Sequence, residues 1–194
     1  MRDLIVSFFA FKPQKIGQLP SVATQTAKSG WEGRVPAWFF PLMDRQSLVA
    51  QFNTLLPLAA EWAAEQEQRI LREGVPLSQP ELADARAAGV REPERVRLLR
   101  VESIPSPAHP MLKAACASTN LIPAAPRGFT VRYGICIRSD CWRDRTIVAH
   151  ELVHTAQYER LGGILPFLSK YLLECATLGY SQAPMEQEAM AAGQ

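Results

Sequence analysis

This chain of 194 residues contains only three histidines, and two of them, His150 and His154, stand four positions apart in the stretch HELVH. The residues around this stretch predict a helix over residues 141–161, with capping residues before it and a Gly-Gly pair after it. Positions i and i+4 of a helix lie one turn apart on one face, so both imidazoles can reach a single metal ion. Glu151 projects about 100° further round the helix, where it can contact a water bound to that ion without replacing a ligand.

The composition of this helix indicates that it is largely buried. Apolar side chains flank the histidines at Ile147, Val148, Val153 and Ala156. Burying two histidines and a glutamate without ligands would be costly, which makes a solvated helix with two chance histidines the weaker interpretation. The HExxH pattern is typical of zinc peptidases, in which the glutamate acts as general base. We therefore predict one Zn²⁺ ion bound by His150 and His154, with Glu151 as the catalytic base.

A catalytic zinc site takes three protein ligands and leaves one position for water, so a third ligand is needed. The extended metzincin pattern requires glycine at position 157 and histidine at position 160, where this chain has Gln157 and Arg160. The third histidine, His109, lies between prolines far upstream and is better explained as a loop or helix-capping residue. The expected third ligand is therefore a carboxylate downstream of the HELVH stretch.

Four glutamates follow that stretch and differ in their places on the expected helices. Glu159 lies about 180° away from the first histidine on the same helix and cannot join the site. Glu174 lies in the next helix, at a separation that suits a helix–loop–helix zinc site. Glu186 and Glu188 lie in the terminal helix, and each shares a face with small or apolar residues. Helical geometry leaves Glu174, Glu186 and Glu188 open.

Residues 150–189 read HELVHTAQYERLGG…FLSKYLLE…GYSQAPMEQEA, and this stretch resembles small bacterial HExxH zinc metallopeptidases of the gluzincin type. In that family the third ligand is a glutamate from a helix after the HExxH helix, often within an E-x-x-A pattern. Glu186 begins such a pattern here. The resemblance thus implies a thermolysin-like zinc site of His150, His154 and Glu186. Position 190 is Met190, so an aspartate that would follow in the family and orient a ligand is missing.

The same resemblance implies a metallopeptidase that hydrolyses peptide bonds in a peptide or protein substrate. In gluzincins a strand beside the zinc helix pairs with extended substrate, which would assign that role to a strand over residues 130–138. Tyr158 and Tyr180 are candidates for stabilising an oxyanion, although a buried tyrosine is more often structural. Gln157 has two interpretations: a side chain that supports a ligand, or a solvent-facing helix residue.

The hydrophobic pattern predicts an α+β fold: a mainly helical single domain with a small sheet next to the HExxH helix. The resemblance narrows this expectation to a minimal zincin-like fold. A helical stripe covers residues 44–73, with Pro57 expected to break it in two, and Ser78 with Glu81 forms a capping box for a short helix that ends at Gly89. The other expected elements are strands over residues 95–104 and 130–138, and helices over residues 111–118 and 165–178 and from Pro184 onward.

Composition limits the partners and the compartment. The net charge of +2 leaves no strong field to hold nucleic acid, and the apolar run over residues 4–11 is about half as long as a membrane span. No signal-peptide cleavage pattern follows that run, and the four cysteines are better explained as reduced thiols. We expect a cytoplasmic protein with no nucleic-acid partner and no membrane span. Residues 1–43 lack regular periodicity and are expected to form an irregular arm on a metallopeptidase domain of residues 44–194.

Two other functions stay open at this point. The first is a zinc-stabilised interaction or regulatory protein that binds the metal without turnover, because a metal site does not by itself imply catalysis. The second is a metal-free helical adaptor, in which HELVH is a chance match.

Overall fold

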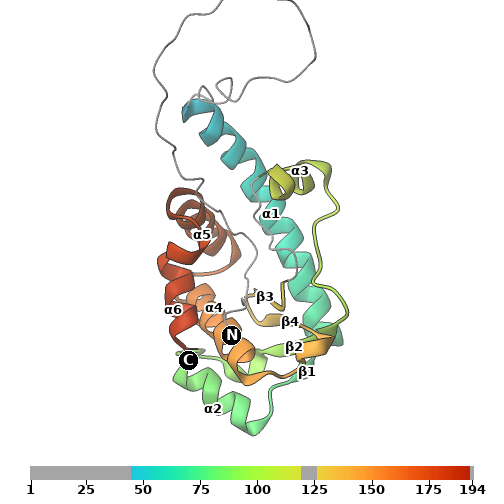
Figure 1. Ribbon diagram of the computed structural model, residues 1–194. Coiled ribbons are helices and arrows are strands. Elements are labelled where there is room, and N and C mark those ends of the chain that lie inside the picture. The colour runs from blue at the N-terminus through green and yellow to red at the C-terminus, as the bar shows by residue number, and fades with distance from the viewer. Residues whose placement is uncertain (1–44, 119–125, 193–194) are drawn as a thin grey trace, which may run out of the picture.

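The computed structural model describes residues 45–118 and 126–192, and the arm expected over residues 1–43 lies outside these ranges. Helices predominate in the described ranges and the sheet is small, so the α+β expectation is confirmed (Figure 1). The helices are α1 (Arg45–Glu73), α2 (Gln79–Ala87), α3 (Pro110–Ser118), α4 (Arg145–Leu161), α5 (Ile164–Leu178) and α6 (Pro184–Ala192). The strands are β1 (Val75–Pro76), β2 (Arg97–Val101), β3 (Gly128–Val131) and β4 (Gly134–Arg138).

The four strands form one mixed sheet in the order β1-β2-β4-β3, with β2 parallel to β4 and the other pairs antiparallel. The single strand expected over residues 130–138 is wrong, because the chain turns at Arg132 and Tyr133 and forms a hairpin of β3 and β4. Arg132 adopts a φ of 53°, in the left-handed region. Gly134 begins β4 where a Cβ would lie 3.0 Å from Cβ of Ile70. The β-branched and aromatic composition therefore predicted extended backbone but not the turn within it.

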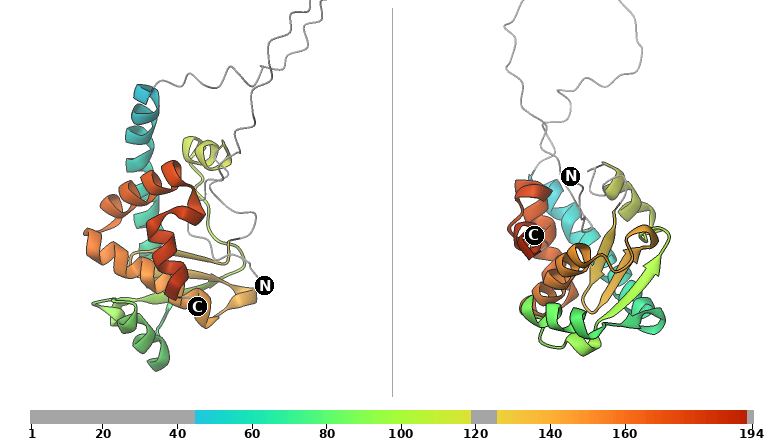
Figure 2. Two further views of the ribbon diagram at one scale, coloured as in Figure 1. Left: turned by 60° about the vertical axis from the view of Figure 1, so that its left-hand side comes forward. Right: turned by 60° about the horizontal axis from the view of Figure 1, so that its bottom comes forward.

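Strand β4 is covered on both faces. Ile135 and Ile137 pack in one core cluster with Leu152 of α4, whereas Cys136 packs in a second cluster with Ile70 of α1. Since successive residues of a strand point to opposite faces, α1 and α4 lie on opposite sides of the sheet (Figure 2). The same alternation in β3 turns Phe129 and Val131 toward α1, and turns Gly128 and Thr130 toward α4.

Helix α1 runs without a break from Arg45 to Glu73, so the expected break at Pro57 is wrong. A proline inside a helix removes a backbone hydrogen bond and costs about 3 kcal/mol. Tertiary packing favours the continuous helix, because the turns after Pro57 place Ala59, Ala63 and Ile70 in the core and contact α5 and the sheet.

Helix α4 begins at Arg145, four residues later than expected. Its cap is Asp144, whose carboxylate accepts hydrogen bonds from two backbone N–H groups of the first turn at 3.0 and 3.3 Å. Arg143 has a φ of 60°, which interrupts the helix before that cap. At the other end, Gly162 takes the left-handed conformation expected of it, with a φ of 93°.

The expected capping box before α2 is confirmed. The Glu81 carboxylate accepts a hydrogen bond from the backbone N–H of Ser78 at 2.7 Å, at the start of α2. Three cysteines are buried free thiols in the described ranges: Cys136, Cys141 and Cys175.

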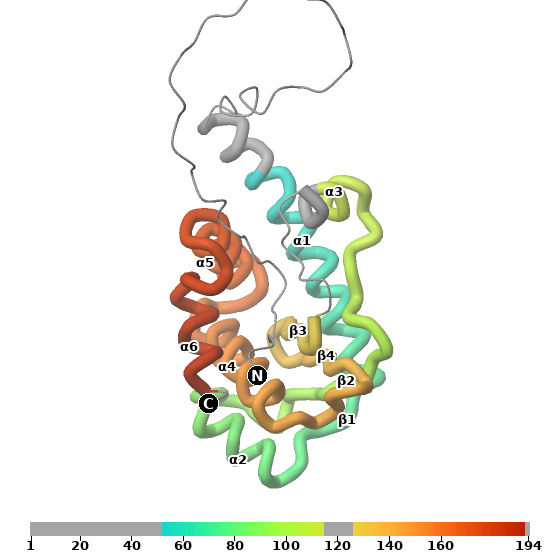
Figure 3. The backbone as a smooth tube through the Cα atoms, in the orientation of Figure 1, coloured from blue at the N-terminus to red at the C-terminus, as the bar shows by residue number. Residues whose placement is uncertain are grey.

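Helices α5 and α6 return the chain to α4. Helix α5 packs on α1, and α6 packs along α4 (Figure 3). Within the described ranges no single helix is long and apolar enough to cross a membrane; α4 and α5 pass that test only together, and they are bent by 115°. The packing of α6 on α4 brings the last described helix to the HELVH stretch.

Candidate metal centre

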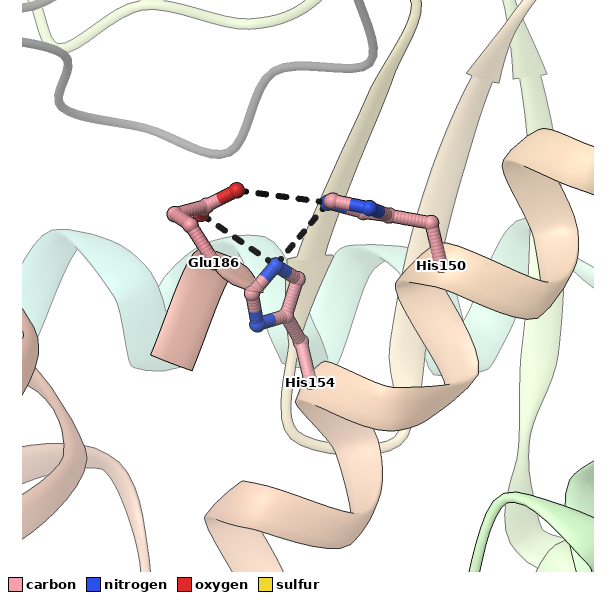
Figure 4. A group of neighbouring side chains, drawn as sticks. All are labelled: His150, His154 and Glu186. Carbon is pink, nitrogen blue, oxygen red and sulfur yellow. Dashed lines mark hydrogen bonds and ion pairs between the residues drawn. The ribbon is translucent and has the colours of Figure 1, made fainter. Parts of the chain in front are cut away.

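Three side chains from two helices converge at the junction of α4 and α6 (Figure 4). Helix α4 supplies His150 and His154, and α6 supplies Glu186. The two Nε2 atoms of the histidines are 3.1 Å apart. Glu186 Oε2 lies 3.5 Å from Nε2 of His150, and its Oε1 lies 3.4 Å from Nε2 of His154. This group could hold a metal ion.

The contacts among these donor atoms are close to the spacing of ligands around a tetrahedral metal ion. In tetrahedral zinc sites the bonds to nitrogen and oxygen are about 2.0–2.1 Å long, so neighbouring donor atoms lie about 3.3 Å apart. The two Nε2 atoms are 3.1 Å apart, and each lies near this distance from a different oxygen of Glu186, at 3.5 and 3.4 Å. One donor atom from each residue lies within 4.8 Å of the others. Two imidazoles and one carboxylate are also a ligand set that zinc takes, and a fourth position is left for water.

The three donor side chains and the neighbouring Glu151 are buried away from solvent. His150, Glu151 and Glu186 are 0% exposed and His154 is 1% exposed. Oε2 of Glu186 has no hydrogen-bond partner among the described residues. A buried carboxylate oxygen without a partner is costly, and a cation among the three donors would satisfy it.

The protonation of the two histidines follows from the same burial. Burial lowers the pKa of His150, and the neighbouring charge of His154 lowers it further. Burial also opposes the charged form of His154, but the Glu186 carboxylate outweighs that effect and raises the pKa of His154. Burial alone would raise the pKa of Glu186, but the charges of His154 and His150, together with hydrogen bonds from His154 and Tyr171, lower it below its usual value. The group therefore favours positive charge between its nitrogen and oxygen atoms, which is the charge a metal ion would supply.

Glu151 lies beside this group and faces β3. Its Oε2 accepts a hydrogen bond of 2.6 Å from Oγ1 of Thr130, whereas its Oε1 is buried without a partner among the described residues. Burial raises the pKa of Glu151 to about 7, although the charge of His154 and the Thr130 hydroxyl oppose the rise. A residue larger than glycine at position 128 would clash with this carboxyl, because a Cβ at Gly128 would lie 2.9 Å from Cδ of Glu151.

Aromatic residues of α5 enclose the other side of the group. The hydroxyl of Tyr171 donates a hydrogen bond of 2.6 Å to Oε1 of Glu186. The rings of Tyr171 and Phe167 meet the ring of His154 edge-on, at centroid distances of 6.0 and 6.1 Å. Tyr171 thus orients the carboxylate, a role that no local sequence signal indicated.

Gln157 is buried, so the solvent-facing interpretation of this residue is wrong. Its Oε1 lies 2.8 Å from Nδ1 of His154. Its Nε2 donates to the backbone carbonyl of Met185 at 2.9 Å and to Oε2 of Glu188 at 3.0 Å. The amide therefore touches one histidine of the group and two residues that flank Glu186.

The other carboxylates considered from the sequence lie outside the donor group. Glu188 pairs with Arg160 through two contacts of 3.0 and 2.8 Å. Oε2 of Glu174 accepts a hydrogen bond from the backbone N–H of Met185 at 3.0 Å, in the first turn of α6. Glu159 accepts hydrogen bonds from the backbone N–H groups of residues 91 and 92.

The other residues considered from the sequence, His109, Tyr158 and Tyr180, are not members of the donor group. His109 is exposed near the start of α3, and its carbonyl accepts a hydrogen bond from the backbone of that helix. Tyr158 stacks on Phe167 at 3.6 Å and donates to the carbonyl of Thr130 at 3.4 Å, which is a structural role. Tyr180 is buried in the core cluster that contains α1 and α5.

Comparison with protein-family models, with curated proteins and with solved structures finds no match to this chain. The gluzincin resemblance of residues 150–189 therefore stays a prediction.

Proposed function

We propose that this chain is a zinc-dependent metallopeptidase with a minimal zincin-like fold and a gluzincin-type ligand set of His150, His154 and Glu186. The observation that carries the proposal is a pairing: three buried side chains that could hold a metal ion lie beside a buried carboxyl, Glu151, whose pKa is raised to about 7. A structural zinc site takes four protein ligands and has no use for such a carboxyl, whereas a catalytic site takes three protein ligands and leaves one position for water.

A zinc ion held by these ligands would lower the pKa of a bound water toward about 7 and polarise a substrate carbonyl. Glu151 is suited to the proton transfers, because a base with a pKa near neutrality can both take and release a proton. The Thr130 hydroxyl holds one oxygen of Glu151, which leaves the unpartnered Oε1 to accept the proton. Glu151 would then pass this proton to the leaving amine.

The place of β3 supports a peptide as the substrate. Strand β3 is at one end of the strand order, so one of its edges has no partner strand in the described ranges. An extended peptide can add to such an edge through main-chain hydrogen bonds, which here requires the edge to be uncovered, because all four residues of β3 are buried. Thr130 of this strand touches Glu151, so a peptide paired there would lie next to the proposed base.

The test compares metal content with hydrolysis in the full chain. The purified protein should carry about one zinc per chain and cleave an unfolded protein substrate. Glu151→Gln should keep the zinc and lose cleavage, and Glu65→Gln, the same change on an exposed turn of α1, should keep both. A protein without stoichiometric zinc contradicts the metal site, and full activity of Glu151→Gln contradicts the assigned base.

One observation favours a second candidate, a zinc-stabilised interaction or regulatory protein. The donor group and Glu151 are at most 1% exposed, whereas a catalytic zinc site needs one coordination position open to water and substrate. Chelation separates the two functions: loss of stability on chelation, with no cleavage by the zinc-loaded protein, supports the second candidate.

A further inference from the structure

Gln157 connects the two helices that supply the donor group. It lies on α4, one turn after His154, and its amide reaches Met185 and Glu188 on α6. It is 0% exposed, so each of its polar atoms depends on a protein partner.

The partners of this amide decide its orientation. The Met185 carbonyl and the Glu188 carboxylate only accept hydrogen bonds, so the side-chain NH₂ group must face them. Oε1 of Gln157 must then face His154, where it accepts the hydrogen from Nδ1. A histidine that donates from Nδ1 presents the lone pair of Nε2, and in His154 that atom faces His150 and Glu186.

An ion pair at the surface holds the amide in turn. Arg160, one turn after Gln157 on α4, binds both oxygens of Glu188. A bidentate pair of this kind fixes the plane of the carboxylate. The Glu188 oxygen that meets Gln157 is therefore held in place, and a chain of contacts runs from Arg160 through Glu188 and Gln157 to His154.

We propose that Gln157, held by Glu188 and Arg160, is the positioning residue that presents Nε2 of His154 to the metal. It takes the place of the aspartate that is missing at position 190, and it acts from the HExxH helix itself. The inference rests on the proposed metal site, and it concerns how the ligand is oriented rather than which reaction follows. Hydrogen-bond partners of this kind typically contribute about 10–100-fold to metal affinity.

The test measures the zinc dissociation constant of the full chain by competition with a chromogenic chelator. Gln157→Leu keeps most of the volume and removes the acceptor, and it should weaken zinc binding about 10–100-fold. Gln187→Leu is the matched control, because Gln187 lies on α6 and bonds only the Ser181 carbonyl at the surface. The control should bind zinc as the wild type does. Equal affinity of Gln157→Leu and the wild type overturns the proposal.

A second variant separates positioning from packing. In Gln157→Glu, position 157 still accepts from Nδ1 of His154 but no longer donates to Met185 and Glu188, so this variant separates the acceptor from the contacts to α6. It should bind zinc more tightly than Gln157→Leu does, even though both variants lose the contacts to α6. If Gln157→Glu binds zinc as weakly as Gln157→Leu does, the acceptor is not what matters and the proposal is wrong.

The visible spectrum with Co²⁺ and the stability of the metal-free protein distinguish the remaining outcomes. The visible spectrum of the Co²⁺-substituted protein should change in Gln157→Leu, because the orientation of a ligand ring changes, and should stay unchanged in Gln187→Leu. If the wild type itself binds neither Zn²⁺ nor Co²⁺, the proposed metal site fails. If the wild type binds zinc and Gln157→Leu loses only metal-free stability, the positioning role alone fails.

Discussion

Replacing Thr130 by valine tests the hydrogen bond that holds Glu151. Valine has nearly the same shape as threonine, so Thr130→Val removes the 2.6 Å hydrogen bond to Oε2 of Glu151 without opening a cavity. The other oxygen of Glu151 has no partner among the described residues. The variant therefore leaves a buried carboxyl group without a side-chain partner on either oxygen, which is costly.

The size of the effect depends on the charge of Glu151. A hydrogen bond to a charged group contributes about 1.5–3 kcal/mol, and a neutral one about 0.5–1.5 kcal/mol. Because the pKa of Glu151 is raised to about 7, the carboxyl is mostly ionised at about pH 8.5 and mostly neutral at about pH 5.5. The loss of unfolding free energy in Thr130→Val should therefore be larger at the higher pH. For a chain of this size, 1.5–3 kcal/mol lowers Tm by about 3–12 °C.

The assay is urea unfolding of the metal-free protein at both pH values. A double-mutant cycle with Glu151→Leu isolates the pairwise term, and Thr177→Val serves as the control, because that exposed hydroxyl bonds only carbonyls of its own helix. The coupling energy should reach about 1 kcal/mol or more at the higher pH. A cost below about 0.5 kcal/mol for Thr130→Val, or additive effects of the two changes, would refute this account of how Glu151 is held.

The remaining predictions concern the metal, the pH and the cap of α4. Zinc at 100 times its dissociation constant should stabilise the protein by about 2.7 kcal/mol and raise Tm by about 5–11 °C in a thermal scan; a shift that persists in His154→Leu would contradict the site. A carboxyl whose pKa is raised on folding, as in Glu151, binds more protons in the folded state, so its contribution to stability falls as the pH rises from about 4.5 to 7. Urea titrations across that range should show this slope in the metal-free wild type relative to Glu151→Gln, and parallel curves would count against the raised pKa. Asp144→Ala should cost about 1 kcal/mol in thermal unfolding, because Asp144 caps α4. Asp140→Ala should cost less, because Asp140 pairs with Arg138 at the surface, and a larger cost for Asp140→Ala than for Asp144→Ala would contradict the cap at Asp144.

Sequence patterns predicted the elements better than their ends and their turns. The expected helices near residues 44–73, 165–178 and from Pro184 are all present, because amphipathic periodicity and terminal glycines act locally. The hairpin at Arg132, the late start of α4 and the unbroken helix at Pro57 were missed. In each case the outcome depends on a contact with another element or on an unusual backbone angle, which composition does not encode.

The candidate site, like the fold, could be predicted from the sequence only in part. The sequence by itself determined that His150 and His154 share one face of a helix, because the i to i+4 relation follows from helical geometry alone. Helical geometry did not choose among Glu174, Glu186 and Glu188. The packing of α6 on α4 places Glu186 in the donor group, puts Glu188 in an ion pair with Arg160, and leaves Glu174 at the start of α6.

Only the tertiary structure shows which residues surround the donor group. Thr130 reaches Glu151 from a strand, Tyr171 reaches Glu186 from α5, and Gln157 joins His154 to α6. None of these contacts has a sequence signature, because each joins elements whose separation is set by how the helices and the sheet bury their apolar faces. Local helix geometry brings two of the candidate donors together, whereas the third donor and its supports depend on the packing of the whole described domain.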